Sequence, residues 1–181
     1  FMNIYNQEKT KLVNSVFDQV YKNYDLMNDI MSLGIHRLWK KNLVSWMNPQ
    51  FGNKIIDVAS GTGDLAKIIS NKNNNQNIIY CAEPNQGMLE IGKKKLKYLK
   101  NVKWHLCSAE KLPFKDNTFD FYTISYGIRN VTDINQCLKE ALRVLKPGGR
   151  FFCLEFSKVE NEILNSLYKN YSKLIPFFGK I

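Results

Sequence analysis

The sequence lacks the cysteine and histidine patterns that indicate a disulfide framework or a metal site. Its cysteines, Cys81, Cys107, Cys137 and Cys153, form no C-x-x-C pair, and the chain has only two histidines. Most of these cysteines lie in apolar segments, where a free thiol behaves as a small hydrophobic side chain. We therefore expect a reduced compartment, no bound metal and no disulfide.

Long apolar runs and acidic residues are also scarce. No apolar segment approaches the roughly 20 residues that span a bilayer, and the N-terminus shows no signal-peptide pattern. Asp and Glu number 16 against 26 Lys and Arg, which gives a formal net charge of +10. Such a charge suits nucleic acid, an anionic membrane surface or a solvated lysine-rich exterior. The lysines are mostly scattered or gathered on one predicted helix, which favours the solvated exterior.

The chain does contain an alternation of apolar strands and amphipathic helices. At 181 residues and 44% hydrophobic side chains, it is long enough to bury the core of one domain. Strands are predicted at Lys54–Ala59, Asn77–Ala82, Val102–Cys107, Phe119–Ser125 and Arg150–Phe156, and helices at about Asp64–Asn71, Gln86–Leu99 and Asp133–Leu145. This alternation predicts an α/β fold with a parallel sheet and helices on both faces. Pro147-Gly148-Gly149 is expected to end the last helix and turn the chain into the fifth strand.

Further helices are predicted on both sides of this core. Residues 9–47 repeat apolar side chains at three- and four-residue steps, with a second helix at about His36–Met47. We expect this helical cap to pack over the sheet edge or to cap the cleft. The chain 1–181 would then form a single domain, with the cap at 9–47, the core at 54–156 and a C-terminal helix at 160–175.

The segment Lys54–Asp64, KIIDVASGTGD, carries the strongest functional signal. It predicts a strand buried on both faces, then a glycine turn, then a helix. Gly61 and Gly63 let the backbone turn sharply and let a ligand approach closely. Glu83 ends the next strand, where a carboxylate can accept hydrogen bonds from both hydroxyls of a ribose. The sequence therefore predicts a nucleoside-containing cofactor at the carboxyl ends of a parallel sheet.

Two classes of cofactor compete for this loop. Residues 61–66 fit the G-x-G-x-x-A pattern of dinucleotide sites, in which a pyrophosphate sits on the helix N-terminus. However, Asp64 occupies that helix start and Asp57 lies on the strand leading in, and two carboxylates would repel a phosphate. They favour S-adenosylmethionine, which carries an ammonium and a sulfonium and no phosphate. The alternative role of Asp64 is that of an acid favoured in a first helical turn.

Two later segments complete the predicted site. Ser108 and Ala109 follow the third strand, where a short side chain and a backbone N–H can meet the edge of an adenine, and residues 112–114 would close over its ring. An ordinary strand-to-helix turn is the alternative for Ser108 and Ala109. Ser125 ends the fourth strand and is expected to face the same cleft.

Five stretches of the chain resemble the ubiquinone/menaquinone-biosynthesis C-methyltransferases, which are class I S-adenosylmethionine-dependent methyltransferases. They are Tyr24–Lys40, Asp57–Leu65, Ala109–Phe114, Ser125–Asp133 and Arg143–Ser157. The resemblance implies a Rossmann-like fold and cofactor contacts at Thr62, Glu83, Ser108, Ala109 and Ser125, with Gly61, Gly63 and Asp64 completing the loop.

The chain departs from the family's pattern at several points. Ser60 replaces a glycine, Glu83 replaces an aspartate, and Ser108 stands where Asn or Asp is common. The family also continues past this chain's C-terminus into more helix and a final strand pair. The resemblance thus implies a C-terminally truncated chain that lacks roughly 50 residues of an ordinary single domain, and we expect it to bind cofactor better than it turns over.

The resemblance also implies C-methylation of a polyprenylated quinol ring. A ring hydroxyl must lose a proton so that the ring carbon can attack the methyl group in line, and catalysis then rests on orientation and on stabilising the anion. Arg129 follows the fourth strand and is our candidate for holding that anion, with a structural ion pair as its alternative. Asn130 and Tyr126 are further candidates. His36 and Asp25 are candidate bases, and a capping or core role is equally open for His36.

The expected partner is a polyprenyl quinol substrate. A quinone-biosynthesis complex, a homodimer and peripheral contact with a membrane remain open, and no nucleic acid is expected. A eukaryotic source implies the matrix side of the mitochondrial inner membrane, and a bacterial source the cytoplasm. The alternative functions are an RNA methyltransferase, prompted by the net charge of +10, an NAD-type oxidoreductase, and a non-catalytic partner in a quinone-biosynthesis complex.

Overall fold

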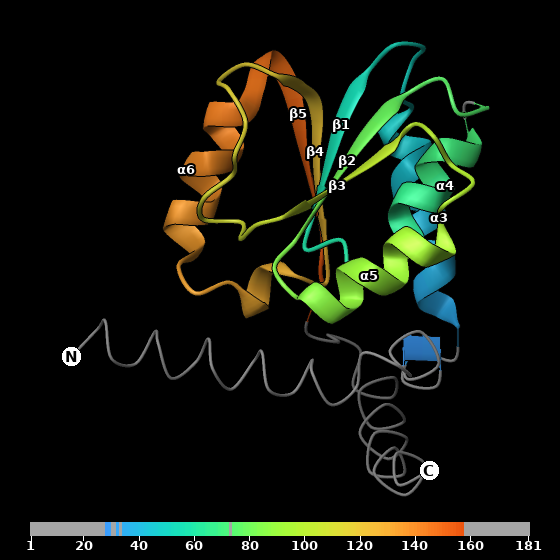
Figure 1. Cartoon of the computed structure of the whole chain (residues 1–181). Helices are drawn as coiled ribbons and strands as arrows, with labels where there is room; N and C mark the ends of the chain where they lie inside the picture. The colour runs from blue at the N-terminus through green and yellow to red at the C-terminus, as the bar shows by residue number, and fades with distance from the viewer. Residues whose placement is uncertain (1–27, 30–31, 33, 73, 158–181) are drawn as a thin grey trace, which may run out of the picture.

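The computed structural model describes residues 28–29, 32, 34–72 and 74–157. One parallel sheet contains β1 (Lys54–Val58), β2 (Ile78–Glu83), β3 (Val102–Leu106), β4 (Phe119–Ser125) and β5 (Leu145–Leu154). The helices are α3 (Ile35–Met47), α4 (Asp64–Lys72), α5 (Gln86–Lys95), α6 (Ile134–Val144) and the short 3-10 helix η2 (Ile128–Asn130). In Figure 1, α6 covers one face of the sheet and α3, α4 and α5 cover the other. The predicted α/β, Rossmann-like architecture is confirmed.

The strand order places a topological switch at the centre of the sheet. The strands lie in the order β3-β2-β1-β4-β5, so the chain moves outward from β1 to β3 and then returns to lay β4 on the other side of β1. In open α/β sheets, ligands bind outside the carboxyl ends of the strands at such a point. A ligand site is therefore expected at the carboxyl ends of β1, β2 and β4.

Successive side chains of the central strands pack alternately into two hydrophobic cores, one on each face of the sheet. Ile56 and Tyr122 point to the α6 side, where they pack with Cys137 and Val144. Ile55 of β1 points to the opposite side and belongs to the core that α3 and α4 complete. Because both faces of β1 are covered, its sequence is apolar at successive positions. The prediction of a strand buried on both faces is confirmed, since every residue of β1 after Lys54 is buried.

The helix α3 packs as part of the helical layer on one face of the sheet. Its residues Leu43, Val44 and Met47 are buried against β1 and α4 in the core of that face. It also contacts the edge strand β5, which agrees with the expected packing at the sheet edge. Lys40 of this helix lines a small pocket at the carboxyl edge of the sheet, and capping of the cleft by the predicted segment stays a prediction. The remainder of the predicted cap, at 9–27, and the predicted helix at 160–175 lie outside the described residues.

Two predicted boundaries are wrong for identifiable reasons. The helix α5 ends at Lys95, four residues before the predicted Leu99, because Leu96 leaves helical geometry with φ −106° and ψ 21°. The strand β5 begins at Leu145, before Pro147-Gly148-Gly149 rather than after it. Leu145 pairs with Phe119, and the Pro-Gly-Gly segment forms the irregularity before the ladder resumes at Arg150. Gly148 has φ 78°, a conformation that favours glycine.

Candidate active site

A cavity of about 360 Å³ lies at the carboxyl ends of β1, β2, β3 and β4. It contains several of the predicted site residues, which come from segments far apart in the sequence. These lining residues are Gly61, Glu83, Ser108, Ala109 and Ser125. The parallel strands bring them together because their carboxyl ends meet at one edge of the sheet. The position of the predicted cleft is thereby explained.

Glu83 ties the glycine turn to the start of α5. Its Oε2 accepts a hydrogen bond from the backbone N–H of Gly61 at 2.7 Å, and its Oε1 accepts one from Asn85 at 3.0 Å. Burial raises the pKa of this carboxyl group, and the two backbone hydrogen bonds oppose that rise. Each carboxylate oxygen can accept a further bond, and Glu83 lines the cavity. A pair of ligand hydroxyl groups would therefore find acceptors here.

The walls on either side of Glu83 are largely apolar. Met88, Leu106 and Val131 line the cavity together with Ser108 and Ala109, which suits a flat ring. Sequence reasoning missed these three apolar residues. A signal existed for Met88, since it follows the helix cap Asn85, whose side chain accepts a hydrogen bond from the Met88 N–H at 3.0 Å.

The predicted cover of residues 112–114 over the ring is wrong. Leu112 is buried in the core on the α6 side. The ring of Phe114 packs edge-to-face on Tyr80 and Phe119, with centroids 5.5 and 5.1 Å apart. Apolar packing within the α6 core therefore decides the course of this segment.

A smaller pocket of about 30 Å³ adjoins the cavity at the glycine turn. Ala59, Gly61, Ser125 and Tyr126 line both spaces. The smaller pocket is also lined by Asn28, Lys40, Asp57, Ser60, Thr62, Asp64 and Leu65. The predicted residues Asp57, Thr62 and Asp64 thus lie in this pocket rather than in the larger cavity. The structure divides the predicted site residues between two neighbouring spaces.

Four residues that line the small pocket carry a buried polar side-chain atom with no hydrogen-bond partner in the described part of the chain. These atoms are Oδ2 of Asp57 and the hydroxyl oxygens of Ser60, Ser125 and Tyr126. The other oxygen of Asp57 accepts a hydrogen bond from the Thr123 hydroxyl at 2.9 Å. Burial raises the pKa of Asp57 to about 7, against the lowering effects of Thr123 and Lys40. Because buried polar groups are normally hydrogen-bonded, these atoms fit a polar ligand group.

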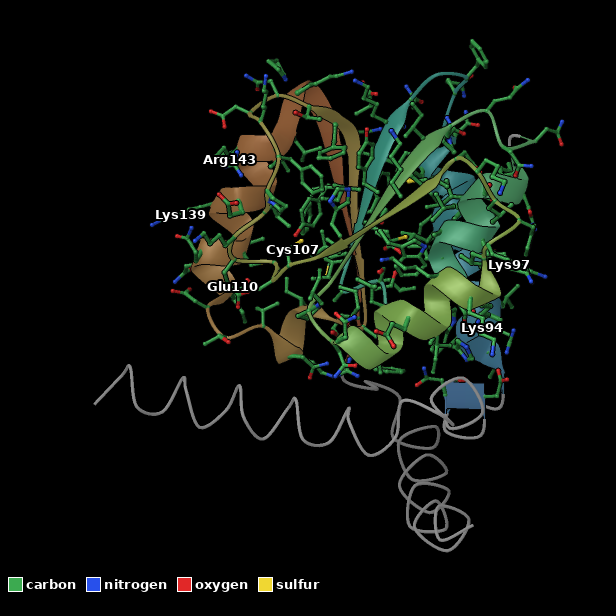
Figure 2. The ribbon with its side chains drawn as sticks, in the orientation of Figure 1. Lys94, Lys97, Cys107, Glu110, Lys139 and Arg143 are labelled. Carbon is green, nitrogen blue, oxygen red and sulfur yellow. The ribbon has the colours of Figure 1, made fainter. Side chains whose placement is uncertain are left out.

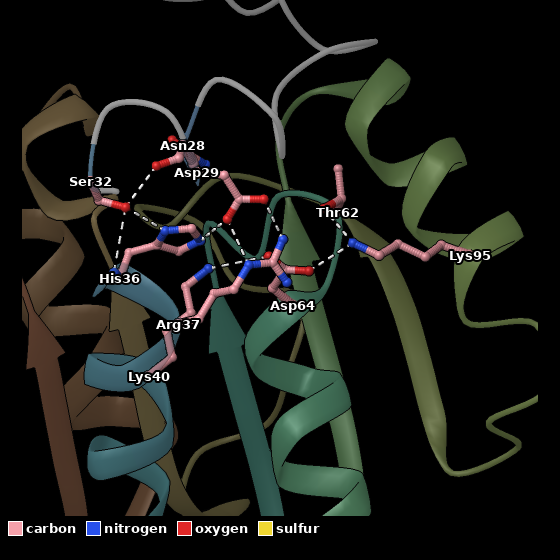
Figure 3. Close-up of polar contacts among 9 residues, drawn as sticks. All are labelled: Asn28, Asp29, Ser32, His36, Arg37, Lys40, Thr62, Asp64 and Lys95. Atoms are coloured by element: carbon pink, nitrogen blue, oxygen red, sulfur yellow. Dashed lines mark hydrogen bonds and ion pairs between the residues drawn. The ribbon is translucent and has the colours of Figure 1, made fainter. Parts of the chain in front are cut away.

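Asp64 is held between two lysines, one on each side (Figure 3). Its Oδ1 accepts a hydrogen bond from Lys95 Nζ at 2.7 Å, and Lys40 Nζ lies 3.6 Å from Oδ2. Burial by itself would raise the pKa of Asp64, but the charges of Lys40 and Lys95 lower it below its ordinary value. The sequence argument treated Asp64 as an unpaired charge that repels phosphate, and this premise is wrong. Lys40 stands 24 residues before Asp64 and Lys95 31 residues after it, so no local pattern revealed the pairing.

Gly63 lies where the loop packs closely on neighbouring side chains. It lines neither space, and a Cβ atom there would come within 2.8 Å of the Leu96 side chain and 2.9 Å of Trp104. Its φ of 83° also requires a residue without a side chain. Close packing on Leu96 and Trp104 therefore accounts for the glycine at this position, and its predicted cofactor contact stays a prediction.

Arg129 does not reach the cavity. It lies in η2, next to the lining residue Asn130. Its guanidinium forms an ion pair with Glu155 and sits 5.4 Å from the centroid of the Phe156 ring. This arrangement matches the structural ion pair that was the alternative for this residue. Its catalytic role stays a prediction.

His36 is part of the packing of α3 rather than of the site. It is buried, with Nδ1 2.6 Å from the Ser32 hydroxyl and Nε2 3.7 Å from Asp29 (Figure 3). Burial, followed by the charge of Lys40, lowers the pKa of its imidazole. His36 lines neither space, and Asp25 lies outside the described residues.

The labelled lysines of the described part of the chain lie on different sides of the molecule. In Figure 2, Lys94 and Lys97 lie on the α5 side of the molecule and Lys139 on α6, across the sheet. Over the described ranges, no three His, Cys, Asp or Glu side chains gather as a metal site requires. The same part of the chain contains no helix long and apolar enough to cross a membrane.

The sheet order, the cavity at the β1–β4 switch and the buried acid ending β2 are those of a Rossmann-like fold that binds a nucleoside, and the comparisons with known proteins place the chain among the methyltransferases that use S-adenosylmethionine. A solved S-adenosylmethionine-dependent methyltransferase from Thermotoga maritima, described as a possible histamine N-methyltransferase, is 27% identical. It aligns with a TM-score of 0.64 over 86% of this chain and 67% of that one. A putative methyltransferase of this class from Methanococcus maripaludis has a TM-score of 0.68 at 19% identity, over 87% of this chain and 70% of that one, and supports the fold alone.

The whole-chain comparison identifies the family. The model of the ubiE/COQ5 methyltransferase family matches residues 3–181. The protein named ubiquinone/menaquinone biosynthesis C-methyltransferase UbiE from Rickettsia bellii is 51% identical over 100% of this chain and 75% of its own length. The protein of the same name from Rickettsia prowazekii is 50% identical over 96% of this chain and 73% of its own length. The chain belongs to the ubiE/COQ5 methyltransferase family, as the resemblance implied.

Proposed function

We propose that this protein transfers a methyl group from S-adenosylmethionine to a ring carbon of a polyprenylated quinol in ubiquinone or menaquinone biosynthesis. The 51% identity to the Rickettsia bellii protein over the whole chain carries this proposal. The cavity at the carboxyl ends of β1–β4 supports it, because its polar and apolar walls suit a nucleoside. Membership of this family disfavours the oxidoreductase and RNA-methyltransferase alternatives.

We assign the larger cavity to the adenosine part of the cofactor. Glu83 would accept hydrogen bonds from the two ribose hydroxyls. Each of its oxygens already accepts one bond from a backbone N–H group, which fixes the carboxylate, and each can accept one more. Ser108 and Ala109 would meet the edge of the adenine, and Met88 and Leu106 would pack on its faces. These assignments rest on the lining of the cavity and on the chemistry of each group.

We assign the small pocket and the shared wall to the sulfonium end of the cofactor. Asp57, Thr62, Asp64 and Ser125 line this space. Gly61 lies between the two spaces, and its N–H is held by Glu83, so the loop is fixed before a ligand arrives. When bound, the cofactor supplies an electrophilic methyl group, and the protein's own contribution is to orient it and to exclude water.

Tyr126 is the side chain best placed to border the substrate. It lines both spaces and has φ 57°, a conformation that is uncommon for a tyrosine. Burial, followed by the charge of Glu155, raises the pKa of its hydroxyl to about 12, so the group stays protonated and can donate to a ring oxygen. Its ring stacks on Phe156 with centroids 4.7 Å apart. This stack would extend an aromatic wall from the cavity toward an apolar substrate tail.

Arg129 remains our candidate for stabilising the substrate anion. This role requires its guanidinium to leave Glu155, because the ion pair now occupies it. Arg129→Ala is expected to lower methyl transfer far more than cofactor affinity. Calorimetry on the same preparations supplies the second measurement, and parallel losses of turnover and affinity would contradict the assigned role.

The reaction itself is tested with labelled cofactor. The 181-residue chain, incubated with methyl-labelled S-adenosylmethionine and a prenylated demethylmenaquinol or benzoquinol, is expected to place the label on a ring carbon. An equivalent RNA incubation serves as the control. Binding of the cofactor with no transfer to any quinol would reject the catalytic proposal and leave the non-catalytic partner role.

The partners and the compartment of this protein also belong to the proposal. A quinone-biosynthesis complex, a homodimer and peripheral membrane contact would each bring the enzyme to a substrate that is dissolved in the bilayer. The mitochondrial location for a eukaryotic source and the cytoplasmic location for a bacterial source both stay predictions.

A further inference from the structure

Three aromatic rings in contact lead from the cavity to the outer face of α3. Tyr126 lines the cavity, and its ring stacks on Phe156 with centroids 4.7 Å apart. The ring of Phe156 in turn meets the ring of Trp39 edge-to-face, with centroids 6.1 Å apart. Both separations are typical of attractive aromatic contacts. These three residues, the aromatic band, therefore join the end of β4, the end of β5 and the helix α3 in one surface.

The outer part of the aromatic band is exposed. Phe156 is 51% exposed and Trp39 39% exposed. Ile35 and Leu38 are exposed beside Trp39, and residues three and four positions apart lie on the same face of a helix. Contiguous exposed apolar surface of this kind marks a site that binds an apolar partner or ligand. The surface that begins at Tyr126 thus continues onto α3 as an apolar face.

The inner end of the aromatic band is polar. The Tyr126 hydroxyl oxygen is buried and has no hydrogen-bond partner in the described part of the chain. The Arg129 guanidinium lies 5.4 Å from the centroid of the Phe156 ring. A second copy of the chain or a membrane surface could cover the outer rings, but neither would supply a partner for the hydroxyl inside the cavity. A ligand with a polar ring at one end and an apolar tail at the other matches both ends of the band.

Resting on the proposed function, we propose that the aromatic band is the tail site of the quinol substrate. The quinol ring lies beside Tyr126, and the first units of the prenyl tail leave the cavity over Phe156 and Trp39 and continue along α3. Phe156 and Trp39 are then specificity-determining residues, because they contact the tail and not the reacting ring. They would make the enzyme favour quinols that carry a tail over quinols that lack one.

The test compares two quinols that differ in the tail alone. Methyl transfer by the 181-residue chain is measured with a demethylated quinol that carries a tail of two prenyl units and with the same quinol carrying a methyl group in its place. We expect the wild-type kcat/KM to favour the tailed quinol by about 10-fold or more, as burial of two or three methylene groups provides. Trp39→Ala and Phe156→Ala should each reduce this ratio by about 3- to 10-fold, as the loss of part of that burial implies. The change should appear in the KM for the tailed quinol rather than in kcat, and Trp39→Phe should retain most of the ratio.

Trp46→Ala is the matched control. Trp46 is a tryptophan of the same helix and is 74% exposed, but it lies seven residues, or about 10 Å, further along α3 than Trp39. Its removal should leave the ratio at the wild-type value. Because both quinols are measured on one preparation, a variant that folds only in part lowers both rates and leaves the ratio intact.

Three results would overturn the tail site. They are a ratio near one in the wild type, a ratio that survives both alanine variants, and an equal fall in Trp46→Ala, which would indicate unspecific partitioning of the tail onto apolar surface. Sedimentation of the wild type and of Trp39→Ala tests the competing occupant, since a loss of dimer with an unchanged ratio would make the band an interface between copies. Absence of transfer to either quinol would instead overturn the proposed function.

Discussion

The substitution Asp57→Asn should change how the stability of this protein depends on pH. Asp57 is 1% exposed at the end of the central strand β1, and its Oδ1 accepts a hydrogen bond from Thr123 at 2.9 Å. Burial raises its pKa from 3.8 to about 7. Asparagine has nearly the same shape and keeps the oxygen that accepts from Thr123, but it does not titrate. The variant therefore isolates the cost of ionising one buried carboxyl group.

The sign and size of the effect follow from the two pKa values. Between about pH 4 and pH 7 the unfolded chain has lost the Asp57 proton while the folded chain still holds it, so the free energy of unfolding falls as the pH rises through this window. The rise from 3.8 to about 7 is roughly three units. At about 1.36 kcal/mol per unit, Asp57 accounts for at most about 4 kcal/mol of this fall. In Asp57→Asn this contribution should disappear.

Urea denaturation of both chains at pH 5, 6, 7 and 8, followed by tryptophan fluorescence, measures the effect. The difference in unfolding free energy between variant and wild type should grow in favour of the variant as the pH rises and should level off above pH 7. Other groups that titrate in the same range cancel in this difference. Parallel pH profiles for the two chains, or a variant that loses further stability relative to wild type between pH 5 and pH 8, would refute the argument.

Two further substitutions test how the site is supported. Gly92→Ala should destabilise the fold by about 1–3 kcal/mol, although alanine is the better helix former, because the added Cβ would lie 2.1 Å from the Trp104 ring; an unchanged denaturation midpoint would contradict this. Arg143→Lys should loosen the segment after β3, because the guanidinium donates to the carbonyl oxygens of Leu112 and Phe114 at 3.0 and 2.7 Å and lysine cannot reproduce that forked geometry. Hydrogen exchange of residues 107–118 should then rise more than that of β1, and equal protection in both chains would count against the clamp.

Much of the fold could be predicted because the local patterns agree with it. The strand β4 has the predicted bounds, Phe119–Ser125, since an apolar run there lies between two polar turns. The position of Glu83, Ser108 and Ser125 around one cavity could also be predicted. Parallel strands leave their carboxyl ends together, so residues that follow successive strands become neighbours.

The sequence could not anticipate the surroundings of residues whose contacts are made by distant side chains. The glycine pattern marked Gly63 as a ligand contact, whereas Trp104 and Leu96 occupy the space beside it. Arg129 follows a strand end like the lining residues, yet its guanidinium pairs with Glu155, which lies 26 residues later, and its catalytic role stays a prediction. In both cases the local sequence fits either role, and only the packing of another element distinguishes them.

By itself the sequence determined the class of fold, the edge of the sheet that holds the site, and the family. The first two depend on hydrophobic periodicity and on the residues that end each strand, which are local properties of the chain, and the family was implied by the resemblance of five stretches to its motifs. Only the tertiary structure decided the electrostatics of the glycine turn, where Lys40 from α3 and Lys95 from α5 converge on Asp64. The net charge of a pocket is a sum over all the elements that meet there, so no single segment of the sequence contains it.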